Sequence, residues 1–86
     1  MIVHVGSVLL EYTKGQSRIE ARGRSVAAVL DDLERRFPGL RFRVIDEQGR
    51  IRPHMRIAVG DQWVTSLERR FRAGEELHLI GALSGG

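Results

Sequence analysis

Apolar and polar side chains alternate near the start of the chain. Ile2, Val3 and Val5 form a strand-like run that Gly6 and Ser7 interrupt and residues 8–10 resume. After a polar turn over residues 11–15, residues 17–22 alternate with a period of two, which is typical of a half-buried strand. The pattern predicts an N-terminal hairpin. Its register stays open, because the connection is longer than a two-residue turn.

Residues 25–37 carry the strongest pattern, with apolar side chains at steps of three and four and charged ones on the other face. The apolar positions are Val26, Val29, Leu30, Leu33 and Phe37. Ser25 is placed to accept a hydrogen bond from the free amides of a first helical turn. Asp32 and Arg36 lie one turn apart in the favourable order, and Pro38 with Gly39 ends the helix. We therefore expect one amphipathic helix lying on a sheet.

The second half of the chain reads mainly as strands. Apolar side chains alternate at Phe42 and Val44 within residues 40–45, before a polar turn over residues 46–49. Residues 55–59 predict a strand, and a turn over residues 60–62 leads to Trp63 and Val64, which completes a second hairpin. Residues 65–72 fit at most one loose helical turn. Residues 77–80 form a last apolar strand that stops at Gly81.

This order of elements predicts an α+β fold, with a mixed sheet of four to five strands and one main helix on one face. It is the β-grasp architecture if the first and last strands are neighbours in the centre of the sheet. A split βαβ sandwich is the alternative, and it needs a second helix that only residues 65–72 can provide. A chain of 86 residues builds one small core. We expect one domain over residues 1–81 and a flexible C-terminal tail over residues 82–86.

Composition excludes several kinds of chemistry. The chain has no cysteine, so disulfides, thiolate metal sites and a cysteine nucleophile are ruled out. Its first residues form neither a signal peptide nor a membrane span, and we expect a cytoplasmic protein with no membrane partner. The net charge is +3, from 14 basic and 11 acidic residues. Acidic residues are mixed among the arginines and aromatic residues are few, so nucleic acid is an unfavoured partner.

Titratable side chains show no pattern of a catalytic or metal site. His4, His54 and His78 lack the local spacing of zinc ligands, and we expect no metal. The paired carboxylates fall on the exposed helix face and in turns, where they would serve solubility: Asp31 with Asp32, Asp46 with Glu47, and Glu75 with Glu76. We expect the protein to be no enzyme and to bind no cofactor of its own.

The C-terminal end carries the most specific signal. An acidic-glycine turn, an apolar strand and a Gly-Gly finish run through residues 73–86, Ala-Gly-Glu-Glu-Leu-His-Leu-Ile-Gly-Ala-Leu-Ser-Gly-Gly. With residues 25–40 and 51–59, this ending resembles the small sulfur carriers of the ubiquitin-like superfamily over essentially the whole chain. They include the molybdopterin synthase small subunit, the thiamin sulfur carrier and the carriers of a thiocarboxylate route to cysteine, to which residues 7–16 look closest. Family tails commonly have proline where Gly81 or Ala82 stands.

The resemblance implies a function that resides in the main chain of the tail. An E1-like activating enzyme would use ATP to adenylate the carboxylate of Gly86 and then exchange AMP for sulfur. A sulfur-accepting synthase would receive that sulfur. The residues before Gly86 would thread into the partner: Gly81, Ala82, Leu83, Ser84 and Gly85. Fully extended, the stretch from Gly81 to Gly86 reaches about 20 Å. Ile80, Arg70 and Arg72 lie near the last strand in sequence and are candidates for partner docking.

Two other functions stay open at this point. In one, the chain is a ubiquitin-like modifier whose activated Gly86 acylates a lysine amine. In the other, it is an arginine-rich nucleic-acid-binding module, whose binding would depend steeply on salt and survive deletion of Gly85 and Gly86. The sequence does not distinguish molybdopterin, thiamin and cysteine as the destination of the sulfur.

Overall fold

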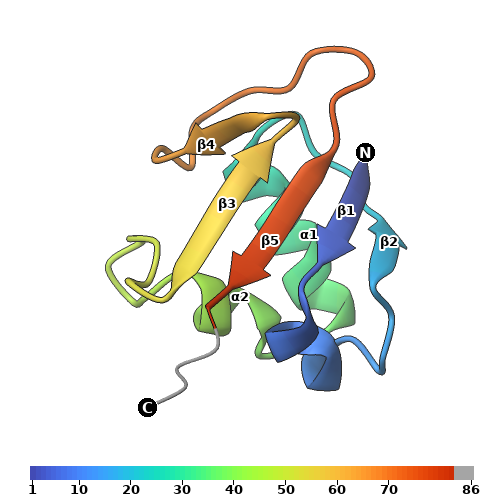
Figure 1. Ribbon diagram of the computed structural model, residues 1–86, viewed down its shortest axis with the longest axis vertical. Helices are drawn as coiled ribbons and strands as arrows, with labels where there is room; N and C mark the ends of the chain where they lie inside the picture. The colour runs from blue at the N-terminus through green and yellow to red at the C-terminus, as the bar shows by residue number, and fades with distance from the viewer. Residues whose placement is uncertain (83–86) are drawn as a thin grey trace.

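The computed structural model describes residues 1–82 and has an α+β fold, as predicted. Five strands form one mixed sheet in the order β2-β1-β5-β3-β4. Their bounds are Ile2–Val5 (β1), Arg18–Glu20 (β2), Met55–Val59 (β3), Gln62–Val64 (β4) and Leu77–Gly81 (β5). The main helix, α1 (Val26–Arg36), lies across one face of the sheet and leaves the other face uncovered (Figure 1).

The last strand, β5, lies in the centre of the sheet and is paired on both sides. It runs parallel to β1, with His4 opposite His78, and antiparallel to β3, with Leu79 opposite Ile57. The prediction that the first and last strands are central neighbours is therefore confirmed. Both predicted hairpins are also present, as the antiparallel pairs β1–β2 and β3–β4. Residues 65–72 contain a turn and an isolated bridge instead of a helix, which excludes the split βαβ sandwich.

Helix α1 begins and ends where the sequence predicts. The Ser25 hydroxyl accepts a hydrogen bond from the amide of Ala28, at 3.2 Å, and so satisfies one free amide of the first turn. Asp32 pairs with Arg36, at 3.2 Å. The apolar stripe is fully buried against the sheet and comprises Val26, Val29, Leu30 and Leu33. This stripe supplies one side of the core, and the inward residues of β1, β3 and β5 supply the other.

The prediction that residues 8–10 resume the first strand is wrong. These residues lie in a 3₁₀ helix, η1 (Ser7–Tyr12). The amide of Gly6 still donates to the carbonyl of Leu79, at 2.8 Å, and the chain leaves the sheet directly afterwards. Leu9 is buried, and Val8 and Leu10 pack partly against the core. A short apolar run fits a single helical turn as well as a strand, and here the packing of Leu9 decides the outcome.

Residues 40–44 are also helical, where the alternation over residues 40–45 suggested an extended segment. Helix α2 (Leu40–Val44) buries Leu40 and Val44, which lie four residues apart, while Phe42 is 54% exposed. The carboxylate of Glu34 accepts hydrogen bonds from the amides of Gly39 and Arg41, at 2.9 and 3.0 Å, and thereby satisfies the start of this helix. A contact from α1 thus sets the local structure.

Candidate functional site

The carboxyl end of β5 is the point at which the chain leaves the sheet. On one side, the Leu79 carbonyl accepts a hydrogen bond from the amide of Gly6. On the other side, Gly81 lies opposite Met55, and the amide of Ala82 donates to the carbonyl of His54, at 2.8 Å. Hydrogen bonds therefore hold the chain up to Leu79 on the side of β1 and up to Ala82 on the side of β3. Of the predicted tail, Leu83, Ser84, Gly85 and Gly86 lie outside the described residues.

Gly81 is part of β5, where a side chain has no room. A Cβ atom at this position would overlap Cγ2 of Val8 and lie 3.1 Å from Sδ of Met55. The 3₁₀ helix η1 thus packs directly against the end of β5. Glycine at this position lets η1 and β3 close around the strand immediately before the chain leaves it.

The open face of the sheet carries a row of aromatic and basic side chains. Paired residues on neighbouring strands point to the same face, and the pairing runs Arg18, His4, His78, Ala58 and Trp63 from β2 to β4. The rings of His4 and His78 are stacked, with centroids 4.5 Å apart and an angle of 11° between their planes. The expectation that these histidines become neighbours is confirmed.

Nearer to the carboxyl end of β5, the open face is apolar and basic. Ile80 is 41% exposed and Trp63 is 60% exposed. Arg56 lies opposite Ile80 in the sheet, and its guanidinium stands 5.5 Å from the centre of the Trp63 ring. Ile80 is therefore a surface residue and not a core residue. Sequence reasoning missed Arg56 and Trp63, although the alternation along β3 and the pairing of the second hairpin could have placed both on this face.

Arg70 and Arg72 lie at the opposite end of β5 from Gly81. Both are exposed and belong to the loop that leads into Leu77, the first residue of the strand (Figure 1). Because β5 runs away from this loop, nearness in sequence does not place these arginines beside the chain's exit. The structure brings Ile80 next to the exit, and it does not bring Arg70 and Arg72 there.

The carboxylates of Glu75 and Glu76 have specific partners, where the sequence suggested only solubility. Arg69 donates two hydrogen bonds to Glu75, both at 2.9 Å, and the amide of Arg72 donates a third at 2.6 Å. The Arg69 bonds are the main reason why the pKa of Glu75 falls from its usual 4.5 to about 2. Glu76 contacts His4 at 2.5 Å, and this hydrogen bond lowers the pKa of Glu76.

Within residues 1–82, no three histidine or acidic side chains are grouped so that they could hold a metal ion. No helix in the described part of the chain has the length and apolar character needed to cross a membrane. The geometry therefore offers a strand that is paired on both sides and ends beside an exposed face of apolar, aromatic and basic side chains.

Comparison with known proteins shows which proteins the chain resembles. No family model matches it. The sulfur carrier protein CysO of Mycobacterium tuberculosis is 28% identical over 89 aligned residues, which cover 98% of this chain and 96% of that protein. The crystal structure of M. tuberculosis CysO superposes with a TM-score of 0.87 at 26% identity, covering 95% of this chain and 98% of that one. The chain is thus distantly homologous to the CysO sulfur carriers over its full length.

Two further structures extend the likeness. In the BexX/CysO complex of Amycolatopsis orientalis the matching chain has a TM-score of 0.88 at 28% identity, with 99% and 98% of the two chains covered. SAMP1 of Haloferax volcanii has a TM-score of 0.78 at 27% identity, with 100% and 98% covered. The β-grasp fold is thereby confirmed. CysO sulfur carriers are substrates on which partner enzymes act and are not enzymes themselves. The Amycolatopsis orientalis structure is that of a CysO in complex with BexX.

Proposed function

We propose that this protein carries sulfur as a thiocarboxylate on its C-terminal residue, Gly86. The likeness to the CysO sulfur carriers over nearly the whole of both chains carries the proposal. The position of β5 supports it, because the strand from which the tail departs is the central one and is paired on both sides. Hydrogen bonds to both neighbouring strands would keep β5 in the sheet while a partner binds the tail.

The chemistry takes place at a main-chain carboxylate. In an E1-like activating enzyme, an oxygen of Gly86 attacks the α-phosphorus of ATP and pyrophosphate leaves. Hydrosulfide then attacks the carbonyl carbon, AMP leaves with the electron pair of the C–O bond, and loss of the thiol proton gives the thiocarboxylate. The partner supplies ATP and the catalytic groups. Gly85 and Gly86 have no Cβ, so the carbonyl is unhindered and the backbone fits a narrow channel. A sulfur-accepting synthase then takes the sulfur.

The remaining predicted site residues are assigned to recognition. Residues 82–85 would extend from the domain of residues 1–81 into the cleft of the partner, with Gly81 as the last residue of β5. Ile80 would anchor the body through the open face, together with Arg56 and Trp63. A partner that covers the whole length of the face would also reach Arg70 and Arg72.

Intact mass spectrometry tests this proposal directly. The protein is incubated with ATP, sulfide and candidate activating enzymes, and we expect one oxygen to be exchanged for one sulfur. A variant with one alanine added after Gly86 is the matched control, because it keeps the body and displaces the reacting carboxylate. It should fold normally and carry no sulfur. Normal loading of this extended chain would show that Gly86 is not the acceptor.

A second candidate is a protein modifier, and the similarity to the small archaeal modifier SAMP1 favours it. In that case the activated carbonyl of Gly86 is attacked by a lysine amine of another protein, AMP leaves and an isopeptide bond forms. Cell lysate separates the two functions. Conjugates that contain a Gly86 isopeptide indicate a modifier, whereas a terminal thiocarboxylate without conjugates indicates a carrier.

A further inference from the structure

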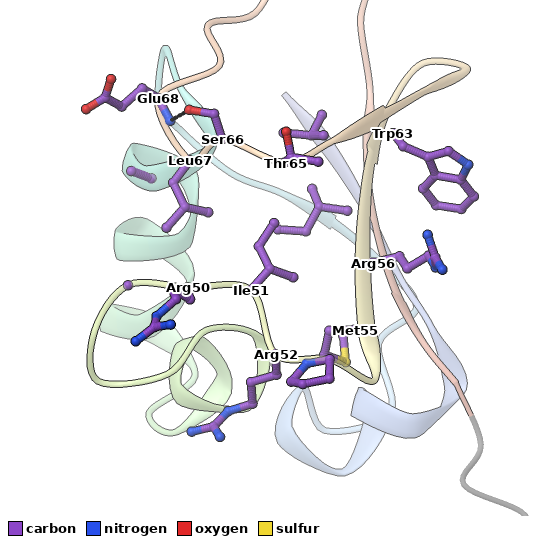
Figure 2. A pocket seen from close by; sticks show the side chains of 15 residues that line it. Arg50, Ile51, Arg52, Met55, Arg56, Trp63, Thr65, Ser66, Leu67 and Glu68 are labelled. Carbon is purple, nitrogen blue, oxygen red and sulfur yellow. Dashed lines mark hydrogen bonds between the residues drawn. The ribbon is translucent and has the colours of Figure 1, made fainter.

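A groove runs beside β4, on the side of the sheet that faces α1. It has a volume of about 760 Å³. The floor is made of aliphatic side chains from α1, β3, β4 and the two flanking loops: Ala27, Ile51, Met55, Ile57, Val64 and Leu67. Ile51 and Leu67 are only partly buried, so the floor is open to solvent between them. Trp63 and Arg56 also belong to the lining, and Figure 2 shows their side chains on the opposite side of the sheet from Ile51, so the groove borders the open face there.

Hydrogen bonds fix both walls of the groove. On one wall, the carbonyl of Leu67 accepts from the amide of Ala27, at 2.9 Å, which ties residues 65–68 to the start of α1. On the other wall, the amide of Arg52 donates to the carbonyl of Val44, at 3.0 Å, and the side chain of Arg52 donates from Nε to the carbonyl of Phe42, at 2.6 Å. The groove therefore exists before anything binds.

Basic and acidic side chains lie at different ends of the groove's rim. Arg50, Arg52 and Arg56 line the groove, and within residues 1–82 none of them forms an ion pair with a carboxylate. The acidic side chain in the lining is Glu68. Figure 2 shows Glu68 at the end opposite to Arg52, with Ile51 and Leu67 between them. The rim thus has a basic end and an acidic end, separated by an aliphatic floor.

These features match an extended acidic segment of another protein. The aliphatic floor offers no ring on which bases could stack, because Trp63, the aromatic residue of the lining, points to the opposite side of the sheet, and this disfavours nucleic acid. Carboxylates beside an aliphatic residue complement both the arginines and the floor. β4 is an edge strand of the sheet, so an extended chain can lie beside it.

We propose that this groove binds an extended segment of a partner protein, with one or two carboxylates at Arg50 and Arg52 and an aliphatic side chain over Ile51 and Leu67. The groove is close to the exit of the chain, because Met55 lines it and also pairs with Gly81. A partner that fills the groove is thereby held next to the tail. This contact does not depend on the chemistry at Gly86.

An NMR titration with a blocked Asp-Asp-Val-Leu-Val peptide tests the proposal. We expect saturable shifts at the amides of Ile51, Val64 and Leu67, which remain when Gly85 and Gly86 are deleted. The double variant Arg50→Glu/Arg52→Glu should weaken binding about tenfold, since each exposed ion pair contributes a few-fold and reversal adds repulsion. Lys14→Glu is the control for a single charge reversal, and Lys14 lies in the loop between η1 and β2, near the edge of the sheet opposite to β4. This variant should bind as the wild type does.

Several results would overturn the assignment. They are equal affinity for the Asn-Asn-Val-Leu-Val peptide, the absence of shifts at the groove amides, and shifts that cluster around His4 and His78 on the open face. A six-nucleotide single-stranded RNA that moves the groove amides at lower concentration than the acidic peptide would also overturn it, in favour of nucleic acid. Since every probe is added without ATP or an activating enzyme, failure here leaves sulfur loading at Gly86 untouched.

Discussion

Replacing Ile80 by alanine tests whether the open face docks the activating partner. Burying a whole isoleucine side chain stabilises a complex by about 1.5–3 kcal/mol. Ile80 is 41% exposed in the free protein, so the share left for a partner to bury is roughly 0.6–1.2 kcal/mol. Ile80→Ala should therefore raise the dissociation constant about three- to eightfold. Trp63→Ala should have an effect at least as large, because its ring is larger and more exposed.

The assay is calorimetric titration of each variant with the activating enzyme, below the unfolding temperature measured for that variant. Phe42→Ala is the control, since Phe42 is 54% exposed but lies on α2, away from the open face. It should keep the wild-type affinity. Ile80→Ala binding as tightly as the wild type would refute docking through this face. An equal loss in Phe42→Ala would mean that loss of exposed apolar surface weakens binding wherever it lies.

Two further predictions concern stability. Folding lowers the pKa of Glu75 from 4.5 to about 2, so its pairing with Arg69 stabilises the fold above about pH 4.5 and is lost as the pH falls toward 2. Glu75→Gln should lower the melting temperature at pH 7, and the difference in melting temperature from the wild type should shrink as the pH falls toward 2. A difference that does not change with pH would contradict this. Gly81→Ala should cost about 1–3 kcal/mol by overpacking against Val8. Urea unfolding of Val8→Ala/Gly81→Ala should then show a smaller loss than the sum of the single losses, and strict additivity would exclude the clash.

The elements that the sequence predicted well are those whose pattern runs for several periods. The stripe of α1 spans three turns, and only one helix orientation buries Val26, Val29, Leu30 and Leu33 together. The two short helices escaped prediction because their runs are too brief to separate a period of 2 from one of 3.6. In α2 the deciding contact comes from Glu34, a residue of another helix. No local pattern can contain that information.

The sequence likewise predicts one part of the candidate site and not the other. The chain's final glycines and last apolar strand are visible in the sequence. The proposed docking face is not visible there, because it arises from the pairing of β3, β4 and β5, which brings Arg56, Trp63 and Ile80 to one surface. Closeness in sequence suggested Arg70 and Arg72, but the direction of β5 puts them at its far end.

A reactive group at the end of the main chain, as proposed for Gly86, would change what the body of the protein has to provide. It needs no enclosed pocket, which a core of this size could hardly build. The body must instead hold β5 in place and present a surface that a partner can bind beside the carboxyl end of β5. Leu77 and Leu79 are fully buried and β5 is paired on both sides, which meets the first need. Ile80 on the open face and Met55 in the groove flank the exit on opposite sides of the sheet, so a partner that grips both surfaces fixes the direction in which the tail departs.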